Sequence, residues 1–214
     1  MPILFLIALI LLLISQIDEA QIISQAQKGS LSAFNKLVMA YQGTAYNVAY
    51  RVTGNQEEAD DACQDAFVKA YKAIKQYQGG SFKSWLLRIV TNTCYDHIRY
   101  KSRRPATSLE DLTENPNEHN TKLVSRAESP EEQSMRSELG DLIQLGINQL
   151  PDDQRVVLVL SDVQGLSYQE IAEIIDQPLG TVKSRLSRGR RRLRDFLLEQ
   201  KELLPGQYRL KYEK

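Results

Sequence analysis

The chain has 214 residues, of which 42% are hydrophobic and 25% are charged, and its 27 Lys and Arg are balanced by 27 Asp and Glu. This length and composition suit one ordinary domain or two small ones. Cys63 and Cys94 are the only cysteines, which excludes a disulfide framework and a cysteine-rich zinc pattern and favours a reducing, cytoplasmic compartment. Cys94 and His97 lack a second pair of ligands, so we expect no metal site and no cofactor.

The chain begins with an apolar run, ILFLIALILLLI at residues 3–14, which ends at Ser15. A helix that crosses a bilayer needs about 20 apolar residues, so we do not expect stable membrane insertion. A secretory signal would start with basic residues and end in an A-x-A cleavage site, whereas the first basic residue here is Lys28. Residues 1–17 are therefore either an anchor or partner-binding segment, or an extension from a start codon assigned too far upstream. We favour the second interpretation because ordinary amphipathic sequence begins directly after it.

After this segment, helical periodicity alternates with polar turns. Apolar residues recur at three-and-four spacing over residues 33–50, as on a helix with one buried face. Beyond the break Thr53-Gly54-Asn55, a second helix is expected from Glu57 to about Ile74, with acidic residues at its amino end, where the helix dipole favours them. A third helix is expected over residues 82–100. Alternating strand patterns are scarce, so we predict an all-α fold.

Residues 105–137 have a different composition, with three prolines, many Ser, Thr and Asn, and seven acidic residues against three basic ones. Such a segment buries little apolar surface and is typical of a flexible linker. The chain is therefore predicted to form two small helical domains, at residues 18–104 and 138–204, followed by a tail at residues 205–214.

The second domain contains a helix-turn-helix pattern. Ser167 and Glu170 form a capping box at the start of a short helix. Pro178 ends that helix and Gly180 permits unusual backbone angles, so a turn is expected before the next helix, near Thr181. Two helices joined by a short turn are the arrangement that places the second helix in the major groove of DNA.

The second helix of this pattern, GTVKSRLSRGRRRLRDFL at residues 180–197, is strongly cationic. At 100° per residue, its apolar side chains share one stripe that should face a core: Val182, Leu186, Gly189, Leu193, Phe196 and Leu197. The opposite face carries Lys183, Ser184, Ser187, Arg188, Arg191 and Arg194. A solvated surface normally mixes both signs of charge, but no acidic residue interrupts this face before Asp195. We therefore expect the helix to bind a polyanion, DNA, at its amino-terminal end.

Both domains resemble one known family. The segment LPDDQRVVLVLSDVQGLSYQEIAEIIDQPLGTVKSRLSRGRRRLR is similar to region four of bacterial sigma factors of the extracytoplasmic-function type. AFNKLVMAYQGTAYNVAYRVTGNQEEADDACQDAFVKAYKAIKQY and SFKSWLLRIVTNTCYDHIRYKSRR resemble the polymerase-binding and promoter-melting helices of region two. The match covers about residues 20–104 and 138–200, in the family's order. Asp176 stands where a glycine is usual, and Asp tolerates the left-handed backbone angles that such a position can require.

The resemblance implies protein partners: core RNA polymerase, through its clamp helices and flap, and an anti-sigma factor. The polymerase contacts would come from the helix that runs from Asp61 to Tyr71, through Asp61, Gln64, Asp65 and Lys69. The acidic patch around these residues could instead bind a divalent metal in an enzyme. That alternative lacks a second carboxylate cluster and a phosphate-binding glycine loop.

The resemblance also implies two DNA contacts. Cationic side chains of the third helix would bind phosphates, whereas an unstacked base needs a stacking surface and a hydrogen-bonding edge. Tyr77 and Asn92 match the family's positions for these two roles, although Tyr77 could equally be a core aromatic. The expected −10 contacts are Tyr77, Arg88, Asn92, Asp96, Arg99, Arg103 and Arg104. The expected −35 contacts are Thr181, Lys183, Ser184, Arg185, Ser187 and Arg188.

The chain is therefore predicted to be a sigma factor that directs promoter-specific initiation and helps to open the DNA. The alternative is a stand-alone helix-turn-helix regulator whose first domain senses a signal or binds a protein. Such a regulator would bind its operator alone, whereas a sigma factor should bind promoters well only with core polymerase. No Ser/His/Asp set, Cys/His pair or nucleotide loop supports catalysis by the chain itself.

The apolar segment leads to a first prediction. We expect the native protein to lack residues 1–17 and to be cytoplasmic, because the segment is short and has no flanking Lys or Arg to bind anionic headgroups. Amino-terminal peptide mapping of the protein from its own cells checks this. Peptides that begin at Met1 and come from the membrane fraction would contradict it.

Overall fold

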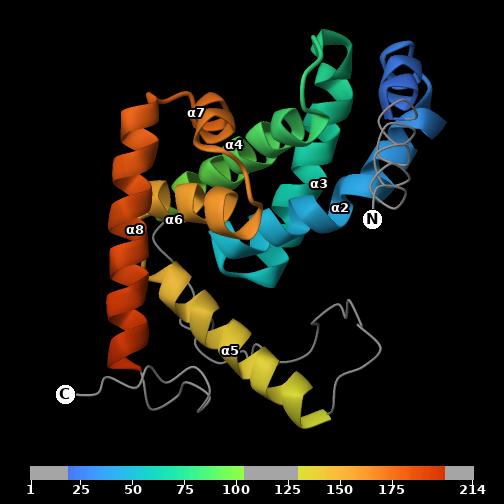
Figure 1. The fold of residues 1–214 in the computed structure, drawn as a ribbon. Helices are drawn as coiled ribbons and strands as arrows, with labels where there is room; N and C mark the ends of the chain where they lie inside the picture. The colour runs from blue at the N-terminus through green and yellow to red at the C-terminus, as the bar shows by residue number, and fades with distance from the viewer. Residues whose placement is uncertain (1–18, 104–129, 201–214) are drawn as a thin grey trace, which may run out of the picture.

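The computed structural model describes residues 19–103 and 130–200 (Figure 1). Within these ranges all regular structure is helical and no strand occurs, which confirms the all-α fold. The apolar segment at residues 3–14, most of the predicted linker and the tail lie outside the described residues, as does Arg104.

Three long helices and a short preceding one form the first half of the molecule. Residues 19–27 are helical, and α2 (Leu31–Thr53), α3 (Gln56–Ala73), a 3-10 turn (Ile74–Gln76) and α4 (Phe82–Arg103) follow. Gly54 ends α2 in the left-handed conformation at φ 74°, and the side chain of Asn55 accepts a hydrogen bond from the backbone N–H of Glu58 at the start of α3. The predicted break thus lies where the sequence indicated.

The second half has four α-helices and one wider turn: α5 (Pro130–Asn148), α6 (Asp152–Leu158), a π-helical turn (Val159–Val163), α7 (Tyr168–Ile175) and α8 (Leu179–Glu199). Helix α5 starts at Pro130, so residues 130–137 are helical although their composition predicted a linker. Proline is well tolerated at the first helical position, because the N–H that it lacks has no partner inside the helix there.

The turn between α7 and α8 differs from the prediction in one respect. The left-handed residue is Asp176, at φ 51°, whose backbone N–H caps α7 at the Ala172 carbonyl. Gly180 is not left-handed but lies inside α8, which begins at Leu179 directly after Pro178. The unusual backbone angle is needed where α7 ends, and an aspartate tolerates it there, as the sequence led us to expect.

The helices pack around one continuous cluster of buried apolar side chains that includes residues of both halves. On α3, Ala59, Ala62, Ala66 and Ala70 are fully buried, and these small side chains let α3 contact both α2 and α4. In Figure 1, α6 lies between α8 and the helices of the first half, and α7 lies beside α4. The helix-turn-helix is therefore held against the first half of the molecule.

The capping box leads to a prediction about stability. The Ser167 side chain accepts a hydrogen bond from the Glu170 backbone N–H, and the Glu170 carboxylate accepts bonds from the Ser167 backbone N–H and hydroxyl. These bonds hold the pKa of Glu170 below its ordinary value. Ser167→Ala should lower the free energy of unfolding by about 1 kcal/mol at neutral pH.

A carboxylate with a lowered pKa stabilises the folded state above its unfolded pKa, and this contribution disappears as pH falls through the folded pKa. The cost of Ser167→Ala should therefore shrink in acid. Ser30→Ala is the matched control, because Ser30 caps α2 at Ala33 and no acidic residue lies in that first turn. Urea unfolding at several pH values measures both costs, and an equal pH dependence would contradict the role of Glu170.

Candidate nucleic-acid interface

Helix α8 is oriented by its buried apolar stripe. Val182 and Leu186 are 0% and 2% exposed, and Gly189 is also buried. At Gly189, α8 lies so close to α6 that an added Cβ would be 3.4 Å from the Gln154 carbonyl oxygen and 3.6 Å from Leu158 Cδ1. The remaining stripe residues, Leu193, Phe196 and Leu197, are half-buried. The predicted apolar face is thus confirmed, and the cationic face points away from the core.

The residues expected at the −35 element differ in exposure along this face. Lys183, Ser187 and Arg188 are exposed, whereas Thr181 and Ser184 are half-buried and joined by a hydrogen bond from Ser184 Oγ to the Thr181 carbonyl. Within the described residues, no ion pair involves Lys183 or Arg188. These two cations are therefore available to a polyanion.

Two other arginines of α8 are held by acidic residues from α6 and the π-helical turn. Arg185 Nε lies 3.0 Å from Asp153 Oδ2, and its side chain is only 25% exposed. Arg190 donates two hydrogen bonds to Asp162, one of them from Nε at 2.9 Å. The bond from Arg190 lowers the pKa of Asp162, although partial burial acts in the opposite direction. The positive charge of Arg185, an expected −35 contact, is thus partly neutralised by Asp153. Arg190 fixes α8 to the π-helical turn through Asp162.

The residues expected at the −10 element lie along α4. Arg88, Asn92, Asp96 and Arg99 are exposed, and the Arg99 guanidinium carbon lies 5.9 Å from the centre of the Tyr95 ring. Arg103 is the last residue of the helix, and its side chain lies outside the described part of the chain. The exposed residues share one helix, as the sequence predicted.

Tyr77 lies beside a hollow of about 690 Å³ at the amino end of α4. Its ring packs edge-on against Phe82 and Trp85, at centroid distances of 5.7 and 5.4 Å, and its hydroxyl donates a hydrogen bond of 2.7 Å to the Gly80 carbonyl. Burial raises the pKa of the Tyr77 hydroxyl. Tyr41 also lines the hollow. Tyr77 is thus a half-buried aromatic that both packs on the core and borders a cavity.

The residues expected to bind polymerase all lie on α3 and are exposed, and two of them also contact α4. Asp61 and Gln64 are exposed. Asp65 Oδ2 lies 3.0 Å from His97 Nε2, and Lys69 Nζ lies 3.3 Å from Asp96 Oδ2. Two expected polymerase contacts are therefore joined to α4, and one of them to an expected DNA contact. Among the described residues, no group of three His, Cys, Asp or Glu side chains is placed to hold a metal ion.

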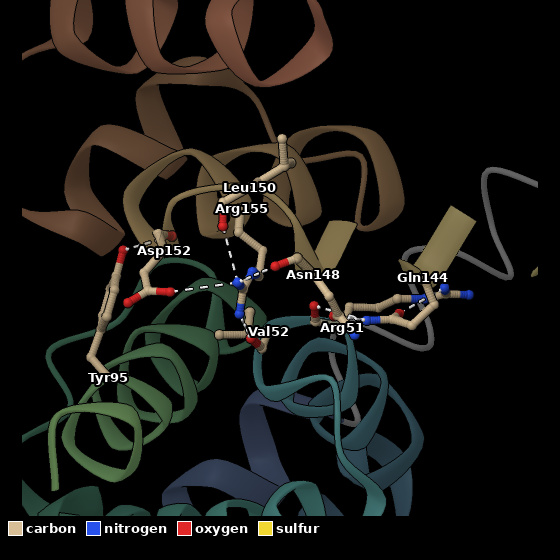
Figure 2. Close-up of polar contacts among 8 residues, drawn as sticks. All are labelled: Arg51, Val52, Tyr95, Gln144, Asn148, Leu150, Asp152 and Arg155. Atoms are coloured by element: carbon tan, nitrogen blue, oxygen red, sulfur yellow. Dashed lines mark hydrogen bonds and ion pairs between the residues drawn. The ribbon is translucent and has the colours of Figure 1, made fainter. Parts of the chain in front are cut away.

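One largely enclosed cation was not singled out by sequence reasoning. Arg155 of α6 is 12% exposed and donates hydrogen bonds to backbone carbonyls of Val52, Asn148 and Leu150 (Figure 2). The only signal in the sequence is its position directly before the apolar run VVLVL, and a lone arginine there does not indicate its partners.

Comparisons with known proteins agree with this geometry. The family models of Sigma-70 region 2 and Sigma-70 region 4 match residues 37–104 and 141–193. The chain is 37% identical to the RNA polymerase sigma-H factor of Pseudomonas aeruginosa over 182 residues, which cover 83% of this chain and 93% of that protein. It is 36% identical to the ECF RNA polymerase sigma-E factor of Escherichia coli K12 over 176 residues, 82% and 92% of the two chains.

Two solved structures have a similar fold, and one of them is a sigma factor. CnrH, in complex with the cytosolic domain of CnrY, has a TM-score of 0.59 at 26% identity and covers 83% of this chain and 96% of its own. The sigma factor RpoE of Bartonella quintana, in complex with the anti-sigma factor NepR, has a TM-score of 0.62 at 25% identity and covers 78% and 98%.

The two regions, in this order on one all-α chain, define a transcription initiation factor of the sigma-70 family. Within that family the chain belongs to the extracytoplasmic-function (ECF) sigma factors. Such proteins are specificity subunits that direct RNA polymerase to promoters, and this is the function of the chain. No helix in the described part of the chain is long and apolar enough to cross a membrane.

Proposed function

We propose that this sigma factor reads the −35 element with the amino-terminal half of α8 and the −10 element with α4 and Tyr77. It docks on the clamp helices of core polymerase through the exposed side of α3, and on the flap through region four. The single observation that carries the proposal is the cationic face of α8, where Lys183 and Arg188 are exposed and free of ion pairs within the described residues.

The division among the cations of α8 supports the −35 assignment. Because α6 and the π-helical turn supply carboxylates to Arg185 and Arg190, the exposed positive charge is concentrated around Lys183, Ser187 and Arg188. Phosphate contacts position a protein on the duplex, whereas bidentate contacts to guanine read sequence, and arginine is suited to the second task. We assign base contact to Arg188 and phosphate contact to Lys183.

The hollow beside Tyr77 supports the −10 assignment. An unstacked base needs an aromatic surface and a cavity that accepts it. The hollow is bordered by Tyr41, Tyr77 and Phe82 and by the backbone of the Gly79-Gly80 turn. Asn92, exposed on α4, would supply the hydrogen-bonding edge, and Arg88 and Arg99 would bind the phosphates of the opened strand.

The remaining parts of the proposal concern domains and partners. Residues 18–104 act as region two and residues 138–204 as region four, in a cytoplasmic protein without a catalytic site of its own. The structural relatives CnrH and RpoE occur with CnrY and the anti-sigma factor NepR. We infer that an anti-sigma factor also controls this chain. A stand-alone helix-turn-helix regulator is not favoured, because the family match includes region two.

The −35 assignment is tested by run-off transcription with core polymerase, first across a promoter library and then on a selected promoter. Arg188→Ala should cost about 1–3 kcal/mol in promoter binding and relax the choice of one base pair. Lys183→Ala should weaken all promoters similarly and reduce the salt dependence. The control Lys28→Ala/Lys36→Ala removes two exposed positive charges outside region four. Unchanged promoter choice and strength in the Lys183→Ala/Arg188→Ala variant would refute the assignment.

The polymerase assignment has its own test. Asp61→Lys/Asp65→Lys reverses two charges on α3, and we expect loss of core binding with the helical circular dichroism spectrum retained. Glu173→Lys/Glu199→Lys makes the same change in net charge at two exposed acidic residues outside α3 and should bind core polymerase normally. Co-purification of the α3 variant with core polymerase at wild-type affinity would give the acidic patch another role.

A further inference from the structure

The hollow beside Tyr77 has a carboxylate in its lining that the proposed −10 contacts leave without a role. Glu19, on the helix of residues 19–27, lines the hollow and is half-buried. Its Oε1 accepts a hydrogen bond from the hydroxyl of Tyr41, which also lines the hollow. Among the described residues, no Lys, Arg or His forms an ion pair with Glu19. The carboxylate is therefore held by a neutral partner and keeps an uncompensated negative charge at the hollow.

Tyr41 fixes the position of this carboxylate. The Tyr41 ring packs against the buried ring of Phe82, at a centroid distance of 5.3 Å. Burial raises the pKa of the Tyr41 hydroxyl, and the hydrogen bond to Glu19 raises it further, so the hydroxyl keeps its proton and continues to donate at neutral pH. Burial and the charge of Glu19 also raise the pKa of the Tyr77 hydroxyl. The negative charge of Glu19 is thus fixed in place and acts on the proposed stacking surface.

Most other polar side chains of the hollow have already used their donors. The side-chain amide of Gln27 donates to two backbone carbonyls, at 3.3 and 2.8 Å, and the Tyr77 hydroxyl donates to a third. Lys83 Nζ donates a 3.1 Å bond to the Gln164 carbonyl. The lining side chains therefore present mainly hydrogen-bond acceptors to a ligand, and the carboxylate is the strongest of them.

A surface of acceptors distinguishes the four DNA bases by their hydrogen-bonding edges. Adenine, cytosine and guanine each carry an exocyclic amino group, whereas thymine has one ring N–H between two carbonyl oxygens. An ionised carboxylate only accepts hydrogen bonds, so it binds an amino group and repels the carbonyl oxygens of thymine. A site built to bond one polar group discriminates strongly against a ligand that lacks it.

Resting on the proposed function of Tyr77 as a stacking surface, we propose that Glu19 determines which base enters the hollow. Glu19 accepts a hydrogen bond from the exocyclic amino group of the unstacked −10 base and excludes thymine, and Tyr41 is the positioning residue that orients the carboxylate. The match to the Sigma-70 region 2 model begins at residue 37, so Glu19 lies outside the matched residues. The helix of residues 19–27 therefore adds a base-specific contact to region two.

The first experiment locates the base that enters the hollow. Holoenzyme is bound to a promoter fragment from the library whose −10 element is single-stranded, and each −10 nucleotide is replaced in turn by an abasic one. At the position that occupies the hollow, loss of the base should weaken binding by the wild type about 10-fold. The same loss should have little effect on the Tyr77→Ala holoenzyme, which lacks the stacking surface.

The second experiment removes the amino group from that base. According to the natural base, 2-pyrimidinone replaces cytosine, purine replaces adenine or hypoxanthine replaces guanine. Wild-type holoenzyme should bind the natural base about 10-fold more tightly than the analogue, as expected for a hydrogen bond to a charged group. It should discriminate against thymine by at least the same factor.

Three variants assign this preference to the carboxylate. Glu19→Gln keeps the size of the side chain but presents an amide that can donate, so it should bind base and analogue about equally and accept thymine better than the wild type does. Tyr41→Phe retains the ring against Phe82 and releases the carboxylate, so its preference should be reduced. Glu173→Gln neutralises an exposed glutamate of α7 and, as the matched control, should keep the wild-type preference.

A purely structural role for Glu19, as a tie between its helix and α2, would weaken binding to all bases by the same factor. Wild-type preference in both Glu19→Gln and Tyr41→Phe would therefore overturn the inference, as would tight binding of thymine by the wild type. Failure of the proposed function is distinguishable, because no −10 position would then lose its sensitivity to an abasic nucleotide in Tyr77→Ala. That result would refute the stacking role of Tyr77 and, with it, base selection by Glu19.

Discussion

The Arg155 guanidinium is a positive charge that little water reaches, and it must therefore obtain its hydrogen bonds from the protein. Desolvation lowers its pKa, and the nearby Asp152 opposes this effect. Its carbonyl partners come from α2, from the last residue of α5 and from the turn between α5 and α6, so three segments must be correctly placed at once. The orientation of α6 follows from this constraint, and α8 packs on α6.

The fold also explains how a chain of balanced charge presents a cationic surface. Two groups of acidic residues have different surroundings. Those at the amino end of α3 are largely exposed to solvent, whereas Asp153 and Asp162 pair with arginines of α8. Only part of the cationic helix therefore remains exposed as unpaired charge. A net charge of zero is compatible with a strongly basic face on α8 because most of the acidic residues lie on other helices.

The aromatic cluster at the start of α4 combines a packed core with the proposed base-stacking surface. Tyr77 is fixed by edge contacts with Phe82 and Trp85, and the side-chain amide of Gln27 donates a 2.8 Å hydrogen bond to its carbonyl. A ring held in this way loses little conformational entropy when a base stacks on it. The two interpretations of Tyr77, as a core aromatic and as a stacking surface, therefore do not exclude each other.

The sequence by itself determined the features that depend on neighbours in the chain. The Gly54 break, the capping box at Ser167 and the apolar stripe of α8 follow from local hydrogen bonding and helical periodicity, and they were predicted correctly. The start of α5 was predicted too late in the chain, because the polar, proline-containing composition of residues 105–137 indicated a linker. Proline is nevertheless well tolerated at the first position of a helix, and α5 begins at Pro130. The sequence marked two residues of the α7–α8 turn as able to adopt unusual backbone angles, Asp176 and Gly180. In the structure Asp176 is left-handed and Gly180 is helical.

Only the tertiary structure decided which charges are paired. Arg185 and Arg188 lie three positions apart on one helix, and helical periodicity alone does not show which of them has an acidic partner. Asp153 neutralises Arg185 because α6 packs along α8, although the π-helical turn and α7 separate these two helices in the chain. In the same way, Arg155 bonds to Val52 over 103 positions. Such pairings depend on how helices pack in space, and sequence periodicity specifies the buried face of each helix but not its partner.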